Sequence, residues 1–105
     1  MIDFYGKEVI ASEKEREDTL KFYFLSTAPL VLKEMPSKLK KKLVVLPVVA
    51  KQFSKNKEYS EKEVNEILKN IYSKDHVYLR RSLIECDFLQ RTGDCSSYFL
   101  SKVGV

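Results

Sequence analysis

The segment from residue 59 to residue 71 contains a complete start signal for an amphipathic helix. Ser60 at the N-cap position and Glu63 three residues later form a capping-box pattern. Tyr59 and Val64 on either side of this start have the spacing of a hydrophobic staple. Apolar side chains then recur every three or four residues, at Val64, Ile67, Leu68 and Ile71. The pattern predicts a helix over residues 61–71 with one buried face.

A longer apolar stripe precedes this helix and is interrupted by a proline. Pro36 suits the first turn of a helix because its missing N–H has no partner there. Apolar side chains follow at helical spacing, at Leu39, Leu43, Leu46, Ala50 and Phe53. Residues 43–49 are also apolar enough for a buried strand, but the length of the stripe favours a helix. Pro47 costs a helix interior about 3 kcal/mol, so we expect a kink or a break there.

Residues 1–32 predict one more helix and the start of a strand. Ser12 and Glu15 form another capping-box pattern. One face of the helix would hold Leu20, Tyr23, Phe24 and Thr27. We expect the helix to end near Ser26, before Pro29, and residues 30–35 to form a short strand.

A third long helix is predicted over residues 75–87. Residues 72–75 form a short polar connection in which Ser73 or Asp75 can serve as the N-cap. The apolar edge of this helix is formed by Leu79, Leu83 and Cys86, and the opposite face by Tyr78, Arg81, Ser82 and Glu85. This opposite face is expected to be exposed.

The order of these elements predicts the fold. Residues 88–91 and 97–100 are apolar segments around a Gly-Asp turn, which predicts a β-hairpin. Helix, helix, tight turn, helix and hairpin is the order of a winged helix-turn-helix. We therefore predict a mainly helical α+β fold, with a winged helix-turn-helix domain of three helices and a C-terminal hairpin over residues 33–105. Residues 1–32 would form an N-terminal helical arm that packs on this domain or on a second copy.

Several stretches between residues 38 and 91 match a known sequence pattern. They are Lys38–Leu46, Tyr59–Leu68, Leu79–Arg81 and Phe88–Arg91. Together they resemble, over residues 33–100, an uncharacterised bacterial family known as domain of unknown function 2087. Some members of that family are fused behind winged-helix repressor domains of the arsenic-repressor type. The resemblance therefore implies a place in transcriptional regulation.

The chain departs from this family in three places. Pro47 interrupts the first helix of the pattern. The family usually closes its hairpin with Tyr-Trp-Arg, whereas Tyr98-Phe99-Leu100 stands here, so an arginine that could contact phosphate is missing. The first thirty or so residues are peculiar to this chain.

Charge is distributed unevenly along the chain. The net charge is +4, but residues 1–32 hold four basic and six acidic side chains, a net charge of −2. The remaining residues hold 15 basic and nine acidic side chains, a net charge of +6. A basic body indicates a polyanion or an acidic protein as partner. A solvated lysine-rich surface is the alternative.

Composition also bounds the class and location of the protein. With 44% hydrophobic and 32% charged residues, the chain is globular in composition. No apolar run reaches the roughly 20 residues that span a membrane, and the first residues lack a signal-peptide pattern. Two cysteines give no disulfide framework. We therefore expect a cytoplasmic protein without a membrane partner.

Residues that could support catalysis or hold a metal are sparse. His76 is the one histidine, and a zinc site usually requires four His or Cys ligands at paired spacing. Cys86 is expected on the buried edge of its helix and Cys95 in the exposed hairpin turn, with a redox pair as the alternative. Three glycines do not supply a phosphate-binding loop. We predict a protein that is not an enzyme and holds no cofactor or metal.

DNA binding is the leading hypothesis for function. In a helix-turn-helix, side chains near the start of the second helix reach base edges in the major groove. Here those side chains would be Tyr78, Arg81 and Ser82, with Lys74 and Arg80 on phosphate. Four lysines open the first long helix, where the helix dipole disfavours cations, which indicates an anionic partner. They are Lys38, Lys40, Lys41 and Lys42, and Arg91 of the hairpin completes the set.

Two other readings of the same residues remain open. Arg80 and Arg81 could instead form internal ion pairs with carboxylates such as Asp75, Glu85 or Asp87. The protein could also be an interaction or dimerisation module of a regulatory system that does not contact DNA. Its interface would then include Leu20, Phe22, Tyr23 and Phe24.

Overall fold

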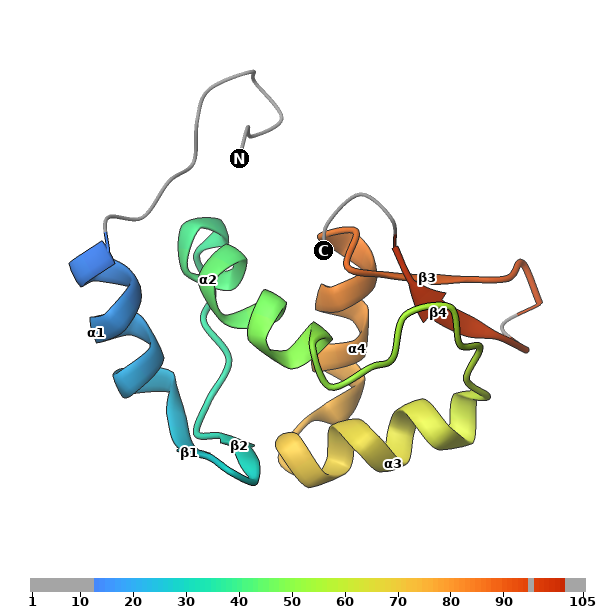
Figure 1. Cartoon of the computed structure of the whole chain (residues 1–105), viewed down its shortest axis with the longest axis horizontal. Coiled ribbons are helices and arrows are strands. Elements are labelled where there is room, and N and C mark those ends of the chain that lie inside the picture. The colour runs from blue at the N-terminus through green and yellow to red at the C-terminus, as the bar shows by residue number, and fades with distance from the viewer. Residues whose placement is uncertain (1–12, 95, 102–105) are drawn as a thin grey trace, which may run out of the picture.

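The computed structural model describes residues 13–94 and 96–101. Its elements are α1 (Glu13–Tyr23), β1 (Phe24–Thr27), β2 (Leu30–Leu32), α2 (Leu39–Ala50), α3 (Glu61–Ile71), α4 (His76–Glu85), β3 (Leu89–Arg91) and β4 (Tyr98–Leu100). Over the described residues the fold is α+β, with four helices and two small antiparallel hairpins. Figure 1 shows α2 and α4 in the centre, between α1 with its hairpin on the left and β3–β4 on the right.

One hydrophobic core connects the helices. Its completely buried aliphatic side chains come from α2, α3 and α4 and include Val45, Leu46, Val49, Val64, Leu68, Leu79 and Leu83. Burial of one such side chain contributes about 1.5–3 kcal/mol, so these stripes determine how the helices face one another. The buried faces that sequence periodicity predicts for α3 and α4 are confirmed at these positions.

The starts of α3 and α4 are fixed by side-chain caps. The Ser60 hydroxyl accepts a hydrogen bond from the Glu63 N–H at 3.1 Å, and the Glu63 carboxylate accepts one from the Ser60 N–H at 3.0 Å. The predicted capping box and the predicted bounds of α3 are therefore confirmed. At α4 the cap is Asp75, whose carboxylate accepts a hydrogen bond from the Tyr78 N–H at 3.0 Å.

Helix α2 is continuous through Pro47, so of the two expected outcomes, a kink or a break, the break does not occur, and residues 43–49 are not a strand. Pro47 lacks the N–H that would bond the carbonyl of Leu43. Four buried side chains from the same part of the helix offset that loss, and they are Val45, Leu46, Val49 and Ala50. The helix begins at Leu39 rather than directly after Pro36, and Pro36 is itself buried.

The N-terminal helix is shorter than predicted. It ends at Tyr23 instead of Ser26, because the chain from Phe24 onward leaves the helix and pairs with residues 30–32 as an antiparallel strand. In this hairpin Phe24 lies opposite Leu32, and both side chains are buried. The predicted strand over residues 30–35 is confirmed for its first three residues. Tertiary burial has therefore overridden the local helical pattern.

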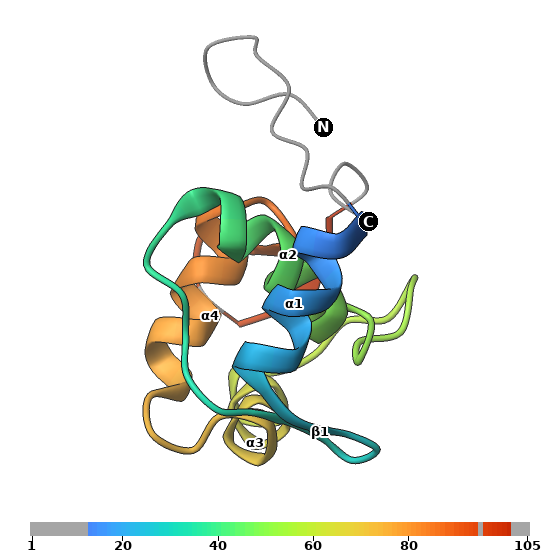
Figure 2. The same cartoon turned by 90° about the vertical axis from the view of Figure 1, so that its left-hand side faces the viewer.

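The described part of the N-terminal arm packs on its own chain. Helix α1 lies along α2 (Figure 2), with Tyr23 in the shared core and Leu20 partly buried against it. Strand β2 packs against α3. None of the described helices is long and apolar enough to cross a membrane.

The second hairpin follows α4 directly, as predicted. Strands β3 and β4 pair with Leu89 opposite Leu100 and Arg91 opposite Tyr98. Phe88 and Leu89 anchor the hairpin in the core. On its other edge, β4 forms an isolated bridge in which Tyr98 pairs with Tyr59, from the connection between α2 and α3.

Candidate nucleic-acid interface

The candidate site is built on α3 and α4, two consecutive helices joined by residues 72–75. The two helices pack closely, with Leu68 of α3 and Leu79 and Leu83 of α4 completely buried. Helix α4 also packs against α2 and runs directly into β3. Helix α4 is therefore in contact with α2, α3 and β3. Its solvent-exposed face is narrower than the sequence pattern predicted.

Arg80 joins α4 to α3. Its Nη1 donates a hydrogen bond to Asn65 Oδ1 at 2.6 Å and lies 3.4 Å from Glu61 Oε1. The Arg80 side chain is 15% exposed, so this contact is shielded from solvent. We predicted a phosphate contact for Arg80, or an ion pair with a carboxylate such as Asp75, Glu85 or Asp87. The contacts found in the structure are instead with α3, and the guanidinium fixes the position of one helix against the other.

Ser82 does not lie on the exposed face, and its predicted contact with a base edge is wrong. The residue is completely buried, because α4 is enclosed by α2 and α3 and its buried stripe includes position 82 as well as Leu79 and Leu83. Its hydroxyl has no hydrogen-bond partner among the described residues. A side chain in this position supports packing and cannot reach a ligand.

Three residues of the predicted set are exposed on α4 and the segments that flank it. Arg81 is exposed on α4, Lys74 is exposed in the turn before it, and Arg91 is exposed at the end of β3. Glu85, one helical turn beyond Arg81, is exposed too and lowers the positive charge of the face. The exposed charged side chains of residues 72–94 are thus three cations, Lys74, Arg81 and Arg91, and four carboxylates, Asp75, Glu85, Asp87 and Asp94.

The lysines that open α2 contact three different side chains. Lys40 Nζ lies 2.7 Å from Glu15 Oε2 of α1, in an ion pair that is about half exposed on both sides. Lys41 Nζ lies 5.9 Å from the ring centroid of Tyr23. Lys42 Nζ lies 5.1 Å from the ring centroid of Tyr78, which is half-buried on α4. Lys38, at the N-cap, is exposed.

No metal site is formed by the described side chains. The described residues contain no group of three or more His, Cys, Asp or Glu side chains that could hold a metal ion. Cys86 is half-buried at the end of α4, and burial raises the pKa of its thiol. Its predicted inert character agrees with that direction. Cys95, the other half of the redox pair we considered, lies outside the described residues.

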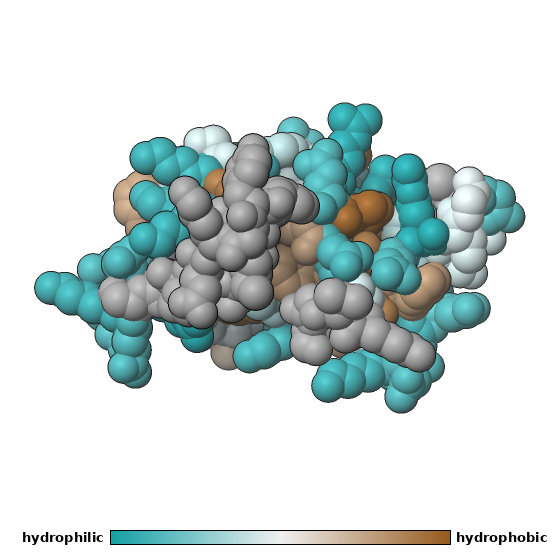
Figure 3. All heavy atoms as spheres, turned by 90° about the horizontal axis from the view of Figure 1, so that it is seen from above, coloured by the Kyte–Doolittle hydropathy of each residue, from teal (hydrophilic) through white to brown (hydrophobic). Residues whose placement is uncertain are grey.

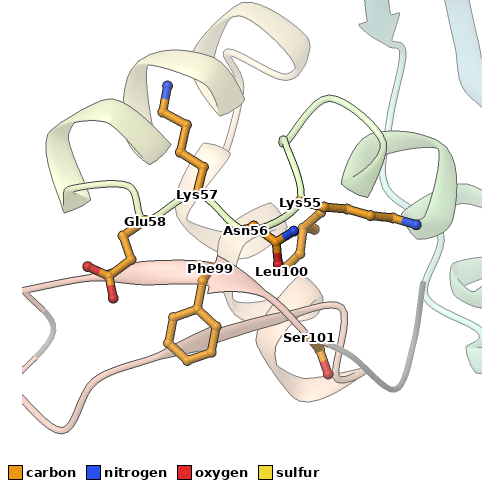
Figure 4. A pocket seen from close by; sticks show the side chains of 7 residues that line it. All are labelled: Lys55, Asn56, Lys57, Glu58, Phe99, Leu100 and Ser101. Carbon is orange, nitrogen blue, oxygen red and sulfur yellow. The ribbon is translucent and has the colours of Figure 1, made fainter.

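A groove that the sequence did not indicate lies between the α2–α3 connection and β4. It has a volume of about 520 Å³ and is lined by residues 55–58 and 99–101 (Figure 4). The groove is formed by a loop and by the edge of a strand. Neither produces a periodic sequence pattern from which it could have been predicted. The one local signal is Asn56, a residue type that tolerates the left-handed conformation it adopts here, with φ 61°.

The remaining surface is mostly hydrophilic, as Figure 3 shows for the face seen from above. Among the described residues, two large hydrophobic side chains are exposed, Phe22 at 53% and Leu25 at 68%. They lie at the junction of α1 and β1. Tyr23 and Phe24, which we had grouped with Phe22 as a candidate interface, are buried in the core.

Four helices and two hairpins define a small α+β domain over the described residues, with Lys74, Arg81 and Arg91 exposed on it. The chain belongs to a family of uncharacterised proteins conserved in bacteria, domain of unknown function 2087, whose family model matches residues 31–100. The resemblance predicted over residues 33–100 is thereby confirmed. Helix α1 and strand β1 precede the matched residues. No curated protein and no solved structure matches the chain.

Proposed function

We propose that this protein is a transcriptional regulator that binds double-stranded DNA through a winged helix-turn-helix. In this proposal α2, α3 and α4 are the three helices, β3–β4 is the wing, and α4 enters the major groove. The observation that supports it most is the position of Arg81. This arginine is exposed on a helix whose other sides are packed against α2 and α3.

Other exposed basic side chains support the same assignment. An arginine on such a helix can pair bidentately with guanine O6 and N7. Lys74 precedes the helix and Arg91 follows it in the hairpin, and both are available for phosphate. On α2 and at its N-cap, Lys38, Lys41 and Lys42 are further candidates for phosphate, whereas Lys40 is paired with Glu15. Arg80 holds α4 in position against α3, because its guanidinium donates a hydrogen bond to Asn65 of α3.

The test is fluorescence-anisotropy binding to a mixed-sequence DNA duplex over a range of salt concentrations. Affinity should fall linearly on a log–log salt plot, with a slope of about −0.9 for each phosphate contacted. The Arg81→Glu variant should bind at least tenfold more weakly at low salt. Lys69→Glu is the matched control, because Lys69 is exposed on α3 and the change in net charge is the same. Equal binding by the two variants, or no binding by the wild type, would contradict the proposal.

The second candidate function is a protein-interaction or dimerisation module, and it is favoured by the exposed side chains of Phe22 and Leu25. Exposed large hydrophobic side chains in one place often indicate a contact surface. A Leu25→Glu variant tests this function by sedimentation or light scattering. A wild-type dimer that becomes a monomer in the variant supports the interface. A wild-type monomer at all concentrations excludes self-association.

A further inference from the structure

The pairing between β4 and the α2–α3 connection stops after one residue pair. Tyr59 and Tyr98 exchange two backbone hydrogen bonds, each of 2.8 Å. In an antiparallel pair the next bonded partners would be two residues further along each segment, at positions 57 and 100. Within the described residues no bridge forms there, and residues 57 and 58 have no regular structure.

The backbone groups of Leu100 have no hydrogen-bond partner among the described residues, and Leu100 lines the groove. Ser97 O accepts a hydrogen bond from Thr92 N, and Ser101 N donates one to Phe88 O. The backbone N–H and C=O groups of the odd-numbered residues in this segment therefore point toward β3. Backbone groups alternate in direction along a strand. The N–H and C=O of Leu100 therefore face away from β3, on the same side as those of Tyr98. Leu100 thus presents one donor and one acceptor at strand spacing, and no strand of the described part of the chain pairs with them.

The shape of the connection keeps the space beside Leu100 open. Asn56 has a φ of 61°, in the left-handed region, and residues 55 and 56 form a turn. The chain diverges from β4 at this turn and leaves the groove between residues 55–58 and 99–101 (Figure 4).

The charges around the groove favour an acidic occupant. Lys55 and Lys57 are exposed and belong to the lining on the loop side. In Figure 4 the Lys57 side chain points away from β4, the Lys55 side chain runs along the loop, and the Glu58 side chain points toward the strand. Lys57 Nζ lies 4.7 Å from the ring centroid of Tyr59, next to the bridge. Glu58 is the acidic residue of the lining and lies at that bridged end. Residues 51–57 contain three lysines and no acidic residue.

We propose that this groove binds an extended, acidic peptide segment of a partner protein, which adds to the outer edge of β4. The backbone groups of Leu100 would bond the peptide main chain, and Lys55 and Lys57 would attract its carboxylates. Addition of a strand to an exposed sheet edge is a general mode of peptide recognition. None of the residues that line the groove belongs to α4, so the proposal does not rest on DNA binding by that helix.

The probe is a fluorescein-labelled eight-residue peptide of alternating valine and glutamate, titrated with the full chain. A second peptide carries proline at two central positions, where it cannot donate backbone hydrogen bonds. The first peptide should bind and the second should bind at least tenfold more weakly. In the ¹⁵N-labelled protein, hydrogen exchange at the Leu100 amide should slow on binding. The amides of Phe99 and Ser101, which already face β3, should change less.

Two double variants test the charge requirement. Lys55→Glu with Lys57→Glu should lower affinity for the valine–glutamate peptide about tenfold, because two attractive surface charges become repulsive. Lys62→Glu with Lys69→Glu, on exposed positions of α3, changes the net charge equally and should alter affinity less than twofold. Absence of binding at about 1 mM protein, equal effects of the two double variants, or an unchanged Leu100 amide would each overturn the proposal.

Discussion

Among single residues, two side chains carry hydroxyl groups that are buried in the core next to apolar neighbours. Ser82 Oγ and Tyr98 Oη are buried without a hydrogen-bond partner among the described residues. Tyr98 is also completely buried between β3 and the bridge to Tyr59. An unpaired buried hydroxyl usually costs about 1–3 kcal/mol. Both side chains are therefore retained for their shape in the core.

Removal of either hydroxyl should leave the protein as stable or more stable. We expect Ser82→Ala and Tyr98→Phe to change the free energy of unfolding by zero to about +1 kcal/mol, because the desolvation penalty disappears and the packing is nearly unchanged. Urea denaturation measures this. A loss of more than about 1 kcal/mol in either variant would mean that the hydroxyl has a partner in solution.

Asp94 gives the hairpin turn a pH dependence. Its pKa is lowered from 3.8 to about 2, first by the hydrogen bond from the Thr92 hydroxyl and then by hydrogen bonds from the Ser96 hydroxyl and N–H. A lowered pKa in the folded state means that the carboxylate stabilises the fold above pH 3.8 and that this contribution is lost as the pH falls toward 2. In the Asp94→Asn variant, stability measured across this window by denaturation should decline less steeply than in the wild type.

At the scale of elements, the success of sequence reasoning depended on how local the determining contacts are. Helix α3 was predicted with its bounds, because its capping box and its apolar stripe are all encoded within twelve residues, 60–71. The end of α1 was missed, because it is set by the pairing of Phe24 with Leu32 across a turn. The buried position of Ser82 was missed for the same reason, since it depends on the packing of α2 and α3 around α4.

The capping box should contribute measurably to α3. Ser60→Ala removes the hydroxyl that accepts from the Glu63 N–H, and we expect a loss of about 1 kcal/mol in unfolding free energy. The pKa of Glu63 is lowered chiefly by the hydrogen bond from the Ser60 N–H and next by the Ser60 side chain. It should rise partway toward its usual value in the variant. Urea denaturation and NMR titration of the Glu63 carboxylate check the two effects.

Arg80 and Arg81 are neighbours with opposite expected roles. Arg80→Met breaks the bond to Asn65 and should cost about 1–3 kcal/mol of stability. Arg81→Met changes an exposed side chain and should alter stability by less than about 0.5 kcal/mol, while weakening DNA binding. Thermal denaturation and anisotropy on the same two variants separate the roles. Equal stability losses would show that Arg81 is also a packing residue.

At the scale of the whole molecule, the family region and the N-terminal addition share one core. The matched residues begin at position 31, yet Tyr23, Phe24 and Leu30 are buried with the residues of α2 and α3. Helix α1 also places Glu15 against Lys40, so acidic and basic parts of the chain meet at this surface. The uneven distribution of charge can be read directly from the sequence. The contacts of the individual lysines could not be predicted from it, because they depend on how α1 and α4 pack on α2.

In the proposed DNA complex, the exposed face of α4 contacts the duplex. Titration of a mixed-sequence duplex into the ¹⁵N-labelled protein, followed by amide chemical shifts, tests it most directly. The largest shifts should fall on Lys74, Arg81 and Arg91 and their neighbours, while the amides of Lys62 and Lys69 on the outer side of α3 should stay in place. Shifts confined to other surfaces, or no shifts at low salt, would contradict the assignment of α4 as the DNA-reading helix.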